Sequence, residues 1–72
     1  MTSAEQLKVY ALGGRRMVYV RKGQGDGLQA HLGSRGFPTG VPQSQGSGLD
    51  RLELERHADV RGAQAALDDW PR

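Results

Sequence analysis

A glycine-rich loop is the first stretch of this 72-residue sequence whose residue types could bind a ligand. It covers residues 22–27 and lies between a predicted strand and a predicted helix. Amides at a helix N-terminus bind anions, and glycines let a phosphate approach the backbone. The candidate anion or phosphate site consists of Lys22, Gly23, Gly25 and Gly27. The spacing matches neither the P-loop nor the dinucleotide fingerprint, and Asp26 adds a negative charge, so a plain glycine-rich turn is the alternative.

A second group combines basic and aromatic side chains within residues 10–21. The candidate surface for a partner or for nucleic acid consists of Tyr10, Arg15, Arg16, Met17, Tyr19 and Arg21. Aromatic rings can stack on bases while cations neutralise phosphates. The same rings and methionine could equally close a contact with a protein partner, which the sequence does not identify, or with a second copy of the chain. Both interpretations stay open.

Catalytic groups are scarce. His31 and His57 are the only side chains suited to act as a base near neutral pH, and most serines lie in terminal or flexible positions. There is no cysteine, and the two histidines and scattered carboxylates match no known metal spacing. We therefore expect no enzyme activity, no metal and no cofactor.

Length and charge limit the remaining classes. Seventy-two residues can build one small hydrophobic core, so residues 1–72 are expected to form a single domain. No apolar run approaches the roughly 20 residues of a membrane span, and the first residues lack a signal-peptide pattern, which favours a cytoplasmic protein without a membrane partner. Residues 1–36 hold six cationic residues against two acidic ones, and residues 37–72 hold four against six. This asymmetry could steer an anionic partner, although ordinary solvated surface is the simpler explanation.

The opening segment is predicted to form a β-hairpin. Runs of alternating apolar residues at 6–12 and 15–22 flank Gly13-Gly14, a pair suited to a two-residue turn. That turn predicts the cross-strand pairs Leu7 with Val20, Val9 with Val18, and Ala11 with Arg16 on one face, and Gln6 with Arg21, Lys8 with Tyr19, and Tyr10 with Met17 on the other. A helix beginning at the capping box of Thr2 and Glu5 and ending at Gly13 is the alternative. Met17 could also be a start codon, which would make residues 1–16 an N-terminal extension.

The rest of the chain predicts two helices and two strands. A helix capped by Asp26 or its neighbour runs to about Arg35, buries Leu28 and Leu32, and ends at Gly36. The side chains of residues 37–41 alternate between two sides, and Pro38 and Pro42 cannot donate to a ladder, which indicates an edge strand or extended segment. The composition of residues 43–48 indicates a flexible loop. A strand over residues 49–56 points Leu52 and Leu54 inward and Arg51, Glu53 and Glu55 outward. A last helix, capped by Asp59, is expected to bury Val60, Ala63, Leu67 and Trp70 and to end at Pro71.

The predicted order is β-β-α-β-β-α, an α+β two-layer sandwich with both helices on one face of a small antiparallel or mixed sheet. The other face would carry Tyr10, Met17 and Tyr19. We expect an accessory or regulatory interaction module that binds a partner through this face and the neighbouring edge at residues 37–42. A single-stranded nucleic-acid-binding protein using the same hairpin is the alternative.

Two stretches resemble a known pattern. Gly27 to Val41 has a helix of the form Leu-x-x-x-Leu that ends in Gly, an apolar residue and Pro before an edge strand. Leu52-Glu53-Leu54-Glu55, followed by Ala58-Asp59 and by residues 63–67, is similar to a last strand and closing helix. Together they resemble small bacterial signal-transducing domains over roughly half of the chain. The resemblance implies an α+β fold and a regulatory role, with no ligand or catalytic residue to transfer.

Overall fold

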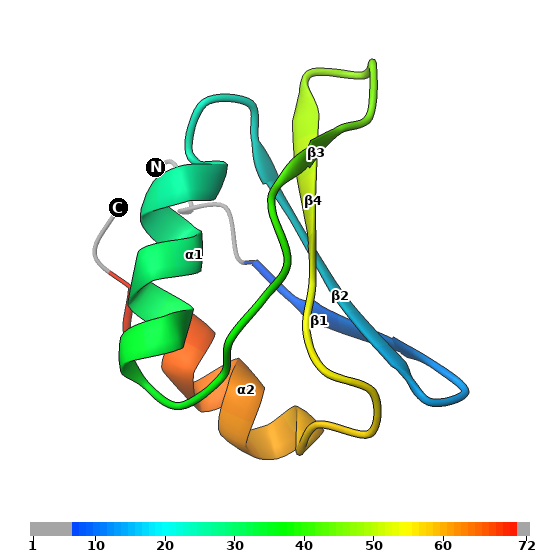
Figure 1. Ribbon diagram of the computed structural model, residues 1–72, viewed down its shortest axis with the longest axis vertical. Coiled ribbons are helices and arrows are strands. Elements are labelled where there is room, and N and C mark those ends of the chain that lie inside the picture. The colour runs from blue at the N-terminus through cyan, green and yellow to red at the C-terminus, as the bar shows by residue number, and fades with distance from the viewer. Residues whose placement is uncertain (1–6, 71–72) are drawn as a thin grey trace, which may run out of the picture.

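The computed structural model describes residues 7–70 of the chain, which form two layers (Figure 1). One layer is a four-stranded antiparallel sheet of order β1-β2-β4-β3, and the other contains two helices on one side of that sheet. The strands are β1 (Val9–Leu12), β2 (Arg15–Arg21), β3 (Gln43–Ser44) and β4 (Leu49–Glu53), and the helices are α1 (Gly25–Ser34) and α2 (Val60–Asp68). The predicted α+β class is confirmed, and the order of elements is that predicted.

The opening hairpin forms in the predicted register. Val9 pairs with Val18, Tyr10 with Met17, and Ala11 with Arg16, across a turn at Gly13-Gly14. Gly13 has φ 58°, while Gly14 has no positive φ, so only the first turn residue uses the left-handed conformation. Because β1 is extended up to Leu12, a helix reaching Gly13 is excluded.

The ladder is shorter than predicted at its open end. It begins at Val9, so Leu7 and Lys8 precede the strand and their predicted pairs are not part of it. The predicted pair of Gln6 with Arg21, the capping box of Thr2 and Glu5, and Pro71 as the end of the last helix lie outside the described residues.

Both helices bury the leucines or alanines that the sequence singled out. The core consists of Val9, Val18, Val20, Leu28, Leu32, Leu52, Leu54, Ala63, Ala66 and Leu67. Val60 and Trp70 are half-buried and pack against it. The N-cap of α2 is Asp59, whose carboxylate accepts a hydrogen bond from the Gly62 amide at 2.9 Å.

Helix α1 ends as predicted but begins earlier. Gly36 has φ 88°, and the Phe37 amide behind it donates to the Leu32 carbonyl at 2.8 Å, a left-handed helix end. The N-cap is Gln24, without a side-chain hydrogen bond, so Asp26 lies inside the first turn instead of capping the helix. A carboxylate in the first turn still suits the helix dipole.

The third strand is displaced from its predicted position. Residues 37–41 form the extended segment that was the alternative to an edge strand, with only an isolated bridge between Thr39 and Leu54, because Pro38 and Pro42 cannot donate to a ladder. The strand is Gln43–Ser44 instead, within the segment predicted to be a flexible loop. Gly46 and Gly48, both with positive φ, return the chain into β4. Among residues 7–70, no helix has both the length and the apolar character needed to cross a bilayer.

Candidate functional site

The sheet has one face packed on the helices and one face that no described helix covers, here called the open face (Figure 1). Alternation along each strand decides which side chains reach it. They are Tyr10, Leu12, Arg15, Met17, Tyr19, Arg21, Gln43, Leu49, Arg51 and Glu53. The open face is therefore built mainly from the hairpin and β4.

Two tyrosines lie against each other on the open face, one on the edge strand β1 and one on β2. The rings of Tyr10 and Tyr19 have centroids 5.8 Å apart at 69°, an edge-to-face arrangement. Tyr10 is 48% exposed, whereas Met17, its cross-strand partner, is only 4% exposed although it lies outside the helix-side core. Because Met17 is buried on a face without helices, the surrounding open-face side chains must cover it. Tyr10 thus has a buried neighbour across the strand pair and remains exposed, whereas Tyr19 is half-buried.

Arg15 and Glu53 form an ion pair beside the tyrosines. The Nε and Nη2 atoms of Arg15 donate to the two carboxylate oxygens of Glu53 at 2.8 and 3.0 Å. This hydrogen bonding lowers the pKa of Glu53 and raises the pKa of Arg15. Both side chains are exposed, so the pair contributes little to stability, but it neutralises the carboxylate that the strands place on this face.

Two shallow hollows border the tyrosines and β4. One, of about 170 Å³, is lined by Lys8, Tyr10, Tyr19, Arg21 and Leu49, together with Leu7 and Val20. The other, of about 230 Å³, is lined by Gly40, Val41, Gln43, Arg51 and Glu53. Arg51 donates to the neutral side-chain amide of Gln43 at 3.1 Å, so its positive charge is kept.

Charge is divided between the two layers of the described chain. The open face and the adjoining Lys8 hold four cations against one carboxylate, that of Glu53. The helices and their caps hold four carboxylates against two arginines; the carboxylates are Asp26, Asp59, Asp68 and Asp69. An anion approaching the protein is therefore attracted to the sheet side.

Five of the six residues predicted for a partner surface lie on the open face, and Arg16 does not. Arg16 is on the helix side, where its Nε donates to the Ala58 carbonyl at 2.8 Å and its Nη1 to the Gly13 carbonyl at 2.8 Å. These bonds tie the hairpin to the segment before α2. The site prediction omitted Lys8 and Arg51, although alternation along residues 49–56 already placed Arg51 outward.

The glycine-rich loop has internal partners. The Gly23 amide donates to the Asp50 carboxylate at 3.2 Å, and the Lys22 amide donates to the Gly48 carbonyl at 2.9 Å. Gly25 is buried: a Cβ added there would lie 2.6 Å from Cβ of Pro42 and 3.0 Å from Oδ2 of Asp50. The Asp50 carboxylate thus lies against two of the glycines predicted to bind an anion, which favours a packed turn, and anion binding at this loop stays a prediction.

The histidines have separate positions. The Nε2 atom of His31 lies 2.7 Å from the Ala66 carbonyl and so joins α1 to α2. His57 is exposed, has φ 62°, and lies close to Gly14, where a Cβ would come within 2.8 Å of the imidazole. Among residues 7–70, no three histidine, aspartate or glutamate side chains are grouped as metal ligands.

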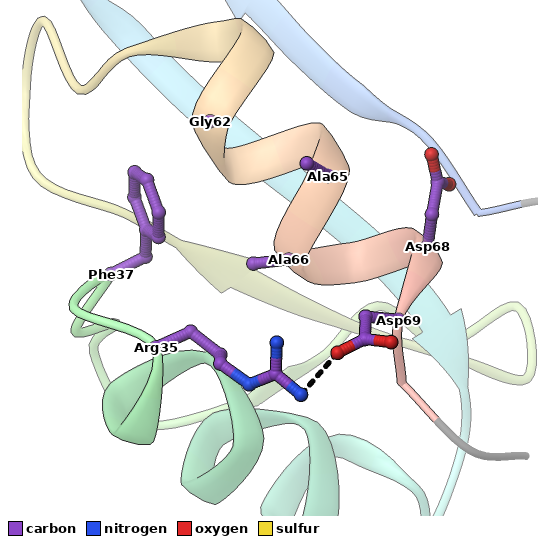
Figure 2. A pocket seen from close by; sticks show the side chains of 7 residues that line it. All are labelled: Arg35, Phe37, Gly62, Ala65, Ala66, Asp68 and Asp69. Atoms are coloured by element: carbon purple, nitrogen blue, oxygen red, sulfur yellow. Dashed lines mark ion pairs between the residues drawn. The ribbon is translucent and has the colours of Figure 1, made fainter.

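A broad groove of about 560 Å³ lies on the helix side between the end of α1 and α2 (Figure 2). Phe37 stands at one end of it, beside Gly62, and Ala65 and Ala66 line it from α2. An ion pair between Arg35 and Asp69 crosses the other end, while the Asp68 side chain points away. The groove offers small residues and a paired charge, with less chemistry than the open face.

Comparison of the chain with models of known protein families, with curated proteins and with solved structures finds no match. The resemblance to small bacterial signal-transducing domains therefore stays a prediction. What the protein binds has to be argued from its own surface.

Proposed function

We propose that the protein is a small binding module, accessory or regulatory in role, that recognises an anionic partner through the open face. One observation carries this proposal: Tyr10, which is 48% exposed, its half-buried neighbour Tyr19 and most of the sheet's cations share the face that the described helices leave uncovered. Tyrosine and arginine contribute strongly to binding surfaces. Tyrosine buries a large area with few flexible bonds, and arginine makes several hydrogen bonds through its planar guanidinium group. We also propose the cytoplasm as its compartment.

The two edge strands of the sheet, β1 and β3, are poorly suited to pair with a strand of a partner, which supports binding of the partner by the open face. At β1, the side-chain amide of Gln64 accepts from the Val9 amide at 2.9 Å and donates to the Leu7 carbonyl at 3.1 Å. It thereby makes the two hydrogen bonds that an added strand would make there, and Asp68 holds its orientation by accepting from Nε2 at 2.9 Å. At the other edge, β3 is two residues long and follows Pro42. Both edges resist strand addition.

Salt elution from immobilised heparin, a generic polyanion, tests the proposal. Lys8→Glu reverses a charge beside the tyrosines, and Arg61→Glu makes the matched reversal on the helix layer. We expect Lys8→Glu to elute at clearly lower salt than the wild type and Arg61→Glu to elute close to it, because only the former weakens the cationic face. Equal loss in both variants would mean that net charge alone governs retention, and would contradict the proposal.

A second copy of the chain is the competing occupant of the open face. The amide chemical shifts of Tyr10, Tyr19 and Arg51 should stay constant as protein concentration rises if the face is free for another partner. Concentration-dependent shifts confined to these residues, with line widths of a dimer, would instead assign the face to self-association and overturn the proposal.

A further inference from the structure

The tyrosine pair presents ring surface with cations around it. Tyr10 and Tyr19 are on adjacent strands, and the hollow beside them is lined by Lys8, Arg21 and Leu49. Bases stack on such rings whatever their identity, since every base has a flat π-face, and cations around the rings hold the phosphates. In this edge-to-face pair Tyr10 is 48% exposed, so it keeps surface on which a base can stack.

Packing beside the rings matters for this chemistry. Met17 is 4% exposed and is the direct cross-strand neighbour of Tyr10. A buried neighbour on one side and Tyr19 in ring contact limit how far the Tyr10 ring can move, so a stacked base meets a surface that is already ordered. The ion pair of Arg15 and Glu53 removes the repulsion that a bare carboxylate would exert on a phosphate at this face.

Apolar side chains are distributed in a way that disfavours a protein partner. Leu12 is 65% exposed and pairs with Arg15 beside the hairpin turn, whereas Leu49 pairs with Arg21 at the opposite end of the face. The two leucines thus lie at opposite ends of the face with the tyrosines and cations between them, and Val41, which is 75% exposed, lies apart from both in the hollow beside Arg51. Protein interfaces concentrate apolar surface at their centre, where charged residues are depleted.

We infer that the anionic partner is a single-stranded nucleic acid whose bases stack on Tyr10 and Tyr19 while its phosphates contact Lys8 and Arg51. This inference rests on the proposed function and narrows its partner to one class. Recognition would depend weakly on sequence, because stacking tolerates any base. Binding would weaken strongly with added salt.

Fluorescence anisotropy with a labelled oligothymidine of about 12 nucleotides, at about 50 mM salt, tests the inference. We expect Tyr10→Ala and Tyr19→Ala each to weaken binding by about 5- to 150-fold, and Tyr10→Phe and Tyr19→Phe to bind nearly as the wild type does, because stacking needs the ring and not the hydroxyl. Lys8→Gln and Arg51→Gln should each reduce the salt slope by about 0.7. Thermal melts of all variants, and Arg61→Gln as a charge control, separate lost binding from lost folding.

Two further probes separate the inference from the proposed function. An abasic oligomer of the same length carries the phosphates without bases, and a poly-glutamate peptide carries carboxylates. If the abasic oligomer or the peptide binds as tightly as oligothymidine and the Tyr→Ala variants lose nothing, the open face recognises anions but base stacking is overturned. If none of the three probes binds, the proposed function falls together with the inference.

Discussion

Replacing Gly25 by alanine tests how the glycine-rich loop is understood. Gly25 is the first residue of α1, is buried, and has no positive φ, so its backbone conformation does not require glycine. What requires it is space: an added Cβ would lie 2.6 Å from Cβ and 2.9 Å from Cγ of Pro42. Pro42 is a rigid ring, so it cannot rotate away and the backbone of one segment has to move. Gly33, in the last turn of the same helix, has no atom within 4 Å of its added Cβ.

Two effects of opposite sign set the magnitude. Alanine in place of glycine in a helix favours folding by up to about 1 kcal/mol, and less at the first position. Inserting a methyl into a filled site costs about 1–3 kcal/mol. At Gly25 the clash therefore wins, with a net loss of about 1–2 kcal/mol, whereas at Gly33 only the gain applies. Since 1 kcal/mol corresponds to about 4–8 °C in a domain of this size, the two variants should move the melting temperature in opposite directions.

Thermal unfolding followed by circular dichroism measures this, with and without inorganic phosphate. We expect Gly25→Ala to melt below and Gly33→Ala above the wild type, by the same amounts with phosphate as without it. Equal upward shifts in both variants would refute the packing argument. A wild-type melting temperature that rises with phosphate, and does not rise in Gly25→Ala, would show that the loop binds anions after all.

Three other substitutions test separate contacts. Asp59→Ala removes the N-cap of α2 and should lower the free energy of unfolding in urea by about 0.5–2 kcal/mol; an unchanged value would mean that the cap is not formed in solution. Glu53→Gln should be less stable than the wild type above pH 4.5, the ordinary pKa of Glu53, because Arg15 lowers that pKa in the folded state. The difference should vanish as pH falls through the lowered pKa, and a constant difference in melts across the pH series would contradict the ion pair. Gln64→Ala leaves the Val9 amide without its acceptor and opens the β1 edge, so sedimentation should show concentration-dependent association; a variant that stays monomeric would count against the edge role of Gln64.

Elements with a local pattern were predictable from the sequence. The hairpin register followed from alternation and the Gly13-Gly14 pair, and α2 followed from Asp59 and an apolar stripe. The short strand β3 was not, because Gln43 and Ser44 carry no strand preference of their own. They become a strand because Gly46 and Gly48 reverse the chain and β4 supplies hydrogen-bond partners, which only the folded arrangement shows.

The candidate site shows the same division between local and long-range information. The alternation of side chains correctly placed both tyrosines on one face of the sheet. It also paired Arg16 with Ala11 on the opposite face, but Arg16 was grouped with the other arginines by its charge and so was wrongly assigned to the partner surface. The role of Gln64 could not be read from the sequence at all. Its partner Val9 is 55 positions away, and a glutamine on a helix gives no sign that it will bond to a strand edge.

The acidic residues of β4 explain why an external anion is expected to bind at the open face and not at the glycine-rich loop. Asp50 pairs with Val20 and so faces the helix side, where its carboxylate accepts from the Gly23 amide, one of the groups of the predicted anion site. Glu53 faces the open side, where Arg15 holds both of its oxygens. Strand β4 therefore places one carboxylate, that of Asp50, at the glycine-rich loop. Its other carboxylate, that of Glu53, lies on the open face and is neutralised by Arg15. An external anion competes with a carboxylate at the loop, whereas at the open face it meets cations, which is why binding is expected there.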